Sequence, residues 1–392
     1  MKPLKIKVQP DDFVVEEIAE LPLRQRGKFA VYFLRKKSWS TLELLRKLSQ
    51  EFKIPFSFFS YGGRKDKHAL TTQYITIKHQ KQIKVEDKRY SLSFMGFMDR
   101  PMGPDLIMGN KFEVVVRELC EEEINSAIAE IEIVKTSGYC NYFDDQRFGS
   151  FDKEQGFIAE KIIKKQYNGA LKVYLTHISS RDRQKDKQKK QFFSENWKDW
   201  KTCCEKAETE FEKNTFSFLM KNSKGFLPML QKIPKEEMSL FFSCYQSYLW
   251  NELLRRIILK QPKSLLKFYE GMIGSYIFYT DLDSENTQYL KTLNIPTLSS
   301  KMKVADSLSR GICEEILMEN GIKTSMFNIR QVRQAFFKSS ERKAIVVPLN
   351  ISFDFLNDEI YKNSKKLVLK FSLPRASYAT MFVKRIFSST LQ

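Results

Sequence analysis

Strand-like runs occupy both ends of the chain, and this arrangement limits the folds that it can adopt. Runs rich in aromatic and β-branched residues lie at 28–35, 73–78 and 111–119. Similar runs return near the C-terminus, at 343–349, 350–356 and 365–373. Strands at both ends with other segments between them predict one sheet domain that carries an insertion.

Helical patterns lie between and beside these strands. Ser40 and Glu43 have capping-box spacing before an apolar helical pattern that reaches Phe52. Three glutamates at 121–123 favour a second helix start, and this helix should end near Gly138. A third helix, over 239–260, has apolar residues on one side, which we interpret as core packing. The sequence therefore predicts a mixed α+β fold with a sheet that is antiparallel in part.

The length of 392 residues suggests two or three domains. Residues 1–265 and 346–392 are predicted to form the sheet domain, in which 151–235 is an extended, helical and basic segment. Residues 266–345 combine a short strand with a helix bounded by Gly321 and are predicted to form a separate, smaller domain.

The charge balance points to a polyanionic partner. Lysine and arginine number 66 against 47 acidic residues, a net charge of +19. Nucleic acid is the leading candidate and an anionic membrane surface the lesser one, while a lysine-rich codon bias would raise the charge without any partner. The basic run 179–191 is either a solvated face or a phosphate contact.

Other classes of protein lack support in the sequence. No run approaches the roughly 18 apolar residues of a membrane span, and no secretory signal precedes residue 13. The six cysteines form no C-x-x-C pair and there are only three histidines, so we expect no metal site. No glycine-rich nucleotide loop appears, so we expect no small-molecule cofactor. Scattered cysteines in a chain without a signal indicate a reducing compartment, so we expect a cytoplasmic protein.

Two segments could carry chemistry. In YGGRKDKHALTTQ (61–73), Asp66 lies among Arg64, Lys65 and other cations, which favour its ionised form. Such a carboxylate suits nucleophilic or base work, but the segment could equally be a surface turn whose charges compensate one another. In SGYCNYFDDQRFGS (137–150), aromatic rings beside Asn141 and Arg147 could form a base pocket or simply a packed corner.

These segments resemble the signatures of the TruD family of tRNA pseudouridine synthases. Six pieces match in the family's order: PDDFVVEEI (10–18), GGRKDKHALTTQ (62–73), GNKFEVVVREL (109–119), NYFDDQRFG (141–149), YQSYLWNELLRRI (245–257) and FSLPRASYATMFVKRI (371–386). The resemblance implies an α+β pseudouridine-synthase catalytic domain with a mixed, largely antiparallel sheet, plus an α/β insertion (TRUD) domain. The sheet domain and the smaller domain predicted above would be these two.

The resemblance also implies a function. The chain would be an isomerase that converts uridine to pseudouridine in tRNA, with position 13 as the leading target, without metal or cofactor. A monomer is the default expectation for its oligomeric state. Asp66 matches the catalytic aspartate, which either attacks ribose C1′ or removes a proton at C2′. The alternatives are a non-catalytic tRNA-binding protein or RNA chaperone on the same scaffold, and a different RNA enzyme such as a methyltransferase.

Further residues take roles from the same resemblance. Phe143 matches the ring that stacks on the flipped base, and Asn141 matches a polar residue that supports the aspartate or the base. The expected substrate-binding residues are Phe143, Asn141, Lys65, Phe13, Glu16, Arg147 and Arg64. Lys65 is expected to be an ion-pair or phosphate partner, and Phe13 and Glu16 belong to the N-terminal element near the active site. Asp144 replaces the family's usual glycine, which would alter the turn or repel phosphate unless Asp144 accepts a positive φ.

Overall fold

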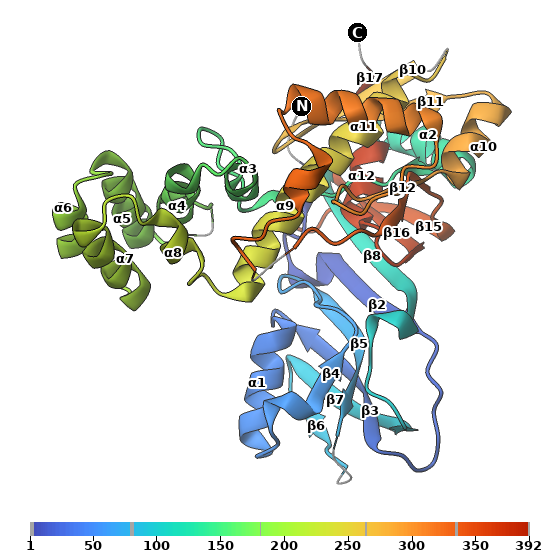
Figure 1. The fold of residues 1–392 in the computed structure, drawn as a ribbon. Coiled ribbons are helices and arrows are strands. Elements are labelled where there is room, and N and C mark those ends of the chain that lie inside the picture. The colour runs from blue at the N-terminus through green and yellow to red at the C-terminus, as the bar shows by residue number, and fades with distance from the viewer. Residues whose placement is uncertain (1–3, 79–81, 181, 263–264, 334–335, 391–392) are drawn as a thin grey trace. The chain divides into compact units, whose positions relative to one another are not determined.

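The computed structural model describes residues 4–78, 82–180, 182–262, 265–333 and 336–390. The chain divides into two compact units (Figure 1). Unit 1 comprises residues 1–139 and 346–388, and unit 2 comprises residues 140–345 and 389–392. Compactness thus groups residues 140–265 with 266–345, whereas the family-based domain boundaries stay a prediction. Within the described residues, no helix has the length and apolar character needed to cross a membrane.

Unit 1 is built on a sheet with the strand order β15-β16-β8-β2-β5-β3-β7-β6, to which β1 and β4 add at β8 and β5. The bounds are β1 Lys5–Ile6, β2 Phe13–Ala19, β3 Phe29–Lys37, β4 Phe59–Tyr61, β5 Leu70–Ile77, β6 Val85–Glu86, β7 Tyr90–Met98, β8 Ile107–Leu119, β15 Leu349–Asn357 and β16 Lys365–Pro374. The pair β2–β5 is parallel and the other described pairs are antiparallel. The predicted α+β fold with a mixed, largely antiparallel sheet is confirmed.

Strands from the two ends of the chain meet in the middle of this sheet. β8 pairs on one side with β2 and on the other with β16, so that Val114 lies between Phe13 and Leu369. The prediction of one sheet drawn from both termini is therefore correct. The predicted strand at 343–349 is wrong in extent, because the run is divided among the end of β13 (Glu341–Lys343), the two-residue β14 (Ile345–Val346) and the start of β15 after Pro348.

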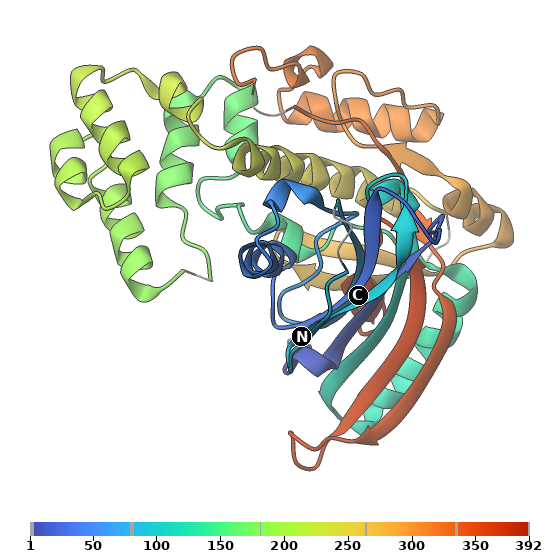
Figure 2. The same ribbon diagram turned by 90° about the horizontal axis from the view of Figure 1, so that it is seen from below.

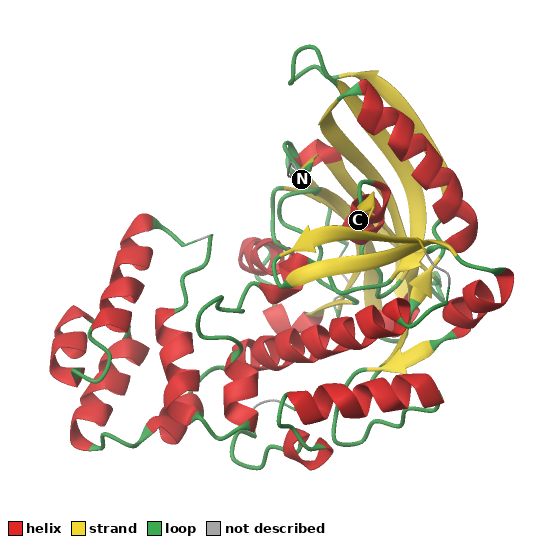
Figure 3. Cartoon of the chain, turned by 90° about the horizontal axis from the view of Figure 1, so that it is seen from above, coloured by secondary structure: helices red, strands yellow, loops and turns green. Residues whose placement is uncertain are grey.

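Three helices accompany the sheet: α1 Thr41–Glu51, α2 Glu121–Ser137 and α12 Ala379–Ile386. The Ser40 hydroxyl accepts from the Glu43 amide and the Glu43 carboxylate accepts from the Ser40 amide, which confirms the predicted capping box. α2 ends at Gly138 with φ 77°, and it runs along the long strands β15 and β16 (Figure 3). The buried Arg385 of α12 pairs with Glu130 of α2 and joins the two helices.

Unit 2 is mostly helical. Its elements are β9 Tyr139–Cys140 at the boundary, α3 Ile158–Ile163, α4 Tyr167–Thr176, α5 Gln184–Glu195, α6 Trp200–Lys206, α7 Glu210–Lys221, α8 Phe226–Leu230, α9 Lys235–Leu259, β10 Leu265–Gly271, β11 Gly274–Asp281, α10 Ser284–Thr292, β12 Asn294–Pro296, α11 Ser307–Glu319, β13 Glu341–Lys343 and β17 Ser389–Thr390. Helices α3–α8 form a cluster beside the N-terminal part of α9 (Figure 2). The predicted apolar side of α9, from Phe242 to Ile257, is buried.

Residues 184–191 of the basic run 179–191 lie in α5, and much of the charge of the described part of the run is paired inside unit 2. Lys189 is only 10% exposed at its side chain and lies 2.8 Å from Glu212, while Lys185 and Lys190 pair with Glu208 and Asp182. These ion pairs favour the structural interpretation of the run over a dedicated phosphate contact.

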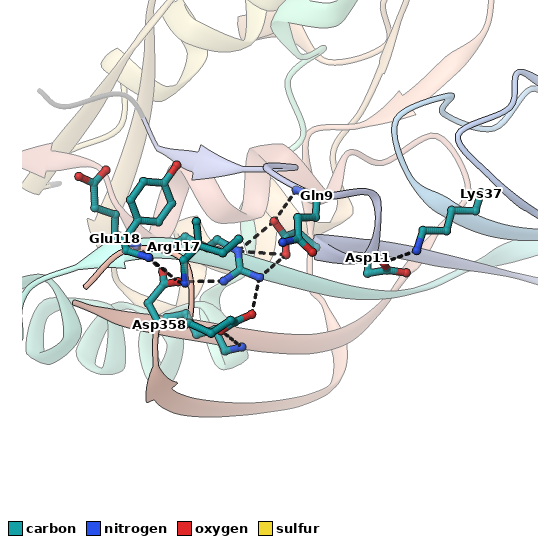
Figure 4. A network of polar contacts seen from close by, with 11 residues as sticks. Gln9, Asp11, Lys37, Arg117, Glu118 and Asp358 are labelled. Atoms are coloured by element: carbon teal, nitrogen blue, oxygen red, sulfur yellow. Dashed lines mark hydrogen bonds and ion pairs between the residues drawn. The ribbon is translucent and has the colours of Figure 1, made fainter. Parts of the chain in front are cut away.

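A buried arginine ties the N-terminal strand region to the C-terminal hairpin of unit 1 (Figure 4). The Arg117 guanidinium donates to Asp12 at 2.7 Å, to Asp358 at 2.9 Å and to Glu359 at 2.9 Å. Arg117, Asp12 and Asp358 are all buried, so each charge depends on its partners in place of water.

We expect Arg117→Met to lower the free energy of unfolding by about 3–5 kcal/mol, because two buried carboxylates lose their counter-charge. Urea unfolding followed by circular dichroism measures this change. The control is Arg24→Met, which removes an exposed ion pair with Asp99 and should change stability little. If both variants had the same free energy of unfolding, the buried network would contribute no more to stability than the exposed ion pair does.

Candidate active site

Asp66 lies on the loop that connects β4 to β5 in unit 1. Gly62 opens this loop, and a Cβ there would lie 2.3 Å from the Ile107 side chain, so close packing explains the glycine. Gly63 faces open space, so only one of the two glycines is required by packing. The Asp66 side chain is 36% exposed, which leaves the carboxylate accessible to a substrate.

The carboxylate of Asp66 pairs with a lysine that the sequence analysis did not single out. Lys7 Nζ donates to Asp66 Oδ2 at 2.7 Å, and the same ammonium lies 4.0 Å from the centroid of the Phe13 ring. Phe13 is buried, so it offers Lys7 a fixed apolar support and a cation–π contact. Lys7 thereby contacts both Phe13 and Asp66, which the sequence analysis expected to lie near each other.

Lys65 points away from solvent and anchors the loop to the sheet. Its Nζ lies 2.9 Å from Glu17 Oε2 and donates to the Asn110 side chain. Glu17 of β2 and Asn110 of β8 are register partners, so their side chains lie next to each other on one face. Lys65 is only 10% exposed, so the structure places it as an internal ion-pair partner, not one for Asp66.

Glu16 lies on the opposite face of β2 and is not brought together with Asp66. It pairs with Lys111 at 3.2 Å, with about half of its side chain exposed. Successive strand residues point to opposite faces, so the neighbouring Glu17 is the glutamate on the side of Lys65. The spacing D-F-x-V-x-E, counted from Asp12, also ends at Glu17, and this signal was available in the sequence.

A second buried lysine lies beneath the loop. Lys36 Nζ donates to the backbone carbonyls of Asp66 at 2.7 Å and Trp39 at 2.8 Å, and more weakly to that of Lys65. Burial lowers the pKa of Lys36 from its ordinary value of 10.5 to about 8, although the charge of Asp66 opposes this shift. One ammonium therefore holds the backbone on which the Asp66 side chain is mounted.

The second predicted segment lies in unit 2, where Asn141 and Phe143 are both buried. Asn251 of α9 clasps Phe143: its Oδ1 accepts from the Phe143 amide and its Nδ2 donates to the Phe143 carbonyl, both at 2.8 Å. Trp250 packs edge-on against the Phe143 ring at 5.5 Å between centroids. The ring is thus held at its backbone and at its edge.

The remaining predicted residues of this segment have clear places. Arg147 donates to Ser247 at 3.2 Å and its guanidinium carbon lies 5.5 Å from the Phe143 ring centroid. Asp144 has φ −81° and ψ 162°, an extended conformation that any residue adopts, so the loss of the family's glycine strains nothing here. Arg64 is exposed on the Asp66 loop of unit 1.

The structure therefore groups the predicted residues in two sets. Unit 1 holds Asp66, Lys65, Phe13, Arg64 and Glu16, the last on the opposite face of β2, and unit 2 holds Asn141, Phe143 and Arg147. The residues around these two sets that sequence reasoning missed are Lys7, Glu17, Lys36 and Asn251. No set of three or more histidine, cysteine or acidic side chains in the described ranges could hold a metal ion.

Comparisons with known proteins agree with the family resemblance found in the sequence motifs. Residues 4–386 match the family model described as tRNA pseudouridine synthase D (TruD). The chain is 31% identical to the probable tRNA pseudouridine synthase D 1 of Methanococcus maripaludis, over 98% of this chain and 100% of that protein. It is 30% identical to the tRNA pseudouridine synthase D of Aquifex aeolicus, over 99% of both. A crystal structure of a TruD protein from Methanosarcina mazei has the same fold, with a TM-score of 0.73 at 24% identity over 97% of this chain and 93% of that one.

The lowered pKa of Lys36 predicts a pH-dependent stability. Between pH 8 and 10, unfolded Lys36 keeps a proton that the folded state has lost, so its contribution to stability rises with pH. The free energy of unfolding should rise with pH more steeply in the wild type than in Lys36→Met, by about 1.4 kcal/mol per pH unit. Urea unfolding at pH 8, 8.5, 9 and 9.5 measures the two slopes. Parallel curves would contradict the shifted pKa.

Proposed function

Because the chain belongs to the tRNA pseudouridine synthase D (TruD) family, we infer that it isomerises uridine to pseudouridine in tRNA. The protein is an isomerase. Its reaction breaks the bond between N1 of uracil and C1′ of ribose and forms one between C5 and C1′. A proton leaves C5 and N1 gains one, so no electrons and no other group are exchanged. The chemistry needs no redox cofactor, and a side-chain carboxylate is sufficient to start it.

We propose that Asp66 is the catalytic carboxylate. The supporting observation is the partly exposed Asp66 carboxylate, bonded at 2.7 Å to Lys7 and mounted on a backbone that Lys36 holds from below. Attack at C1′ and proton removal at C2′ both require the ionised carboxylate, and the Asp66 carboxylate accepts a hydrogen bond from the Lys7 ammonium. Lys65 is proposed to fix the loop through Glu17, and the exposed Arg64 to contact RNA phosphate.

Unit 2 is proposed to bind the target uridine. A uridine in structured RNA must leave its stack before a side chain can reach its sugar, and an aromatic ring then replaces the lost stacking. The clasped Phe143 ring suits this role, because its orientation is fixed before the base arrives. Asn141 is proposed to hydrogen-bond the base or the carboxylate, and Arg147 to contact the RNA beside the ring.

We further propose that the target is position 13 of tRNA and that the enzyme acts as a monomer in the cytoplasm. The family membership supports a tRNA substrate, and the net charge of +19 suits a polyanionic one. This proposal includes no metal ion and no small-molecule cofactor, and the internally balanced reaction consumes no co-substrate.

Asp66→Asn tests the central assignment. We expect the single-turnover rate of pseudouridine formation on an unmodified tRNA transcript to fall at least ~10³-fold, with tRNA affinity close to that of the wild type. The control is Asp99→Asn, which changes a carboxylate that is 52% exposed and should leave the rate unaltered. Pseudouridine mapping on the product also identifies the modified position. A wild type that binds tRNA but forms no pseudouridine would favour the non-catalytic alternative.

Lys7→Met tests the counter-ion. Methionine keeps the apolar contact with Phe13 but removes the charge beside Asp66, so we expect kcat to fall about tenfold or more. Lys7→Arg keeps the charge and should recover part of the rate. If Lys7→Met turned over like the wild type, the ion pair would have no part in catalysis.

A further inference from the structure

Arg342 is a buried cation in unit 2 that lies outside every matched motif. It sits in the middle of β13, opposite Ile295 of β12. Its guanidinium donates to the Asn141 carbonyl through Nε at 2.9 Å and through Nη2 at 2.7 Å. Nη2 also reaches the Asn141 side-chain Oδ1 at 2.8 Å. The arginine is 6% exposed, so these contacts replace its hydration.

These contacts fix the orientation of the Asn141 amide. Arginine has only donors, so the group that faces Arg342 must be the Asn141 oxygen. On the other side, Asn141 Nδ2 donates to the Lys343 carbonyl at 3.1 Å, and a carbonyl is only an acceptor. Both partners demand the same orientation, so the amide cannot flip without losing both bonds. Its second N–H is therefore presented as a donor, which suits a uracil carbonyl or a carboxylate.

The same guanidinium lies on the face of the Phe143 ring. Its central carbon is 4.1 Å from the ring centroid and 5.1 Å from the Trp250 ring. Arg342 therefore supports the ring across one of its faces. A guanidinium held by four hydrogen bonds is a rigid support for that ring.

We propose that Arg342 is a positioning residue for the isomerisation, which sets Asn141 as a hydrogen-bond donor and supports Phe143 for stacking on the target uracil. This inference rests on the proposed function of unit 2. Arg342 itself does not touch the reacting atoms in this proposal. Its effect is confined to recognition of the base, whereas general tRNA affinity comes from phosphate contacts elsewhere.

The test uses Arg342→Met and Arg342→Lys in the full chain. Lysine keeps the charge but has neither the planar group that covers the ring nor the fork that bonds Asn141. The control is Arg385→Lys, a substitution of another buried arginine, which pairs with Glu130 in unit 1. Circular dichroism establishes that each variant is folded, and Arg342→Lys decides the matter if Arg342→Met does not fold.

Two readouts separate positioning from a general structural role. The first is the single-turnover rate on the tRNA transcript, which we expect to fall at least tenfold in both Arg342 variants and to stay unchanged in Arg385→Lys. The second needs no turnover. In the Asp66→Asn background, affinity is measured for transcripts with uridine or with an abasic nucleotide at position 13. In the Arg342 variants, the ratio of the affinity for the uridine transcript to that for the abasic transcript should approach one. The affinity for the abasic transcript itself should stay as in the protein with Arg342.

The outcomes are distinct. Folded Arg342 variants with wild-type rate and wild-type uridine preference would overturn the inference, and so would an equal loss of affinity for both transcripts. If the wild type itself forms no pseudouridine, the proposed function fails. The uridine preference then still decides whether Arg342 organises a base-binding site.

Discussion

The register of β2 against β8 is the constraint on which the Asp66 loop depends. It places Glu17 beside Asn110, and Lys65 reaches both from the loop. A shift of one residue would turn Glu17 to the other face and bring Glu16 in its place. Lys65 would then lose its buried partner, and the loop its anchor to the sheet. The position of the proposed catalytic carboxylate is thus set by strand pairing, at a distance from the carboxylate itself.

Several cations of this basic protein form internal contacts that stabilise the fold and do not point toward RNA. Lys36, Lys65, Arg117 and Arg342 all point inward and are satisfied by carbonyls or carboxylates. The lysines of the basic run in α5 are paired in the same way. The total of 66 lysine and arginine residues therefore overstates the number of cations that face the substrate. Composition indicates the class of partner, but only the contacts show which cations are available to it.

Local patterns predicted the elements well, and non-local contacts account for what they missed. The capping box at Ser40, the buried side of α9 and the strands from both ends follow from spacing that the chain itself carries. Family motifs supplied Asp66, Asn141 and Phe143. Arg342 lies 201 residues from Asn141, and Lys7 lies 59 residues from Asp66. No periodicity connects such pairs, so their roles emerge only when the fold brings them into contact.

The proposed reactive residues are held mainly by their backbones. Lys36 donates to the Asp66 carbonyl, Asn251 clasps the Phe143 amide and carbonyl, and Arg342 donates to the Asn141 carbonyl. A bond to the backbone fixes where a side chain starts, and it adds to the side-chain contacts of Asp66 with Lys7 and of Asn141 with Arg342 and Lys343. One oxygen of the Asp66 carboxylate and one N–H of the Asn141 amide then keep their capacity for a substrate, although their positions are fixed in advance. Preorganisation of this kind lowers the ordering that binding would otherwise require. It also explains why the side chains of Lys36 and Arg342 are long, buried and polar: they must reach a neighbouring backbone from a separate element and be bonded when they arrive.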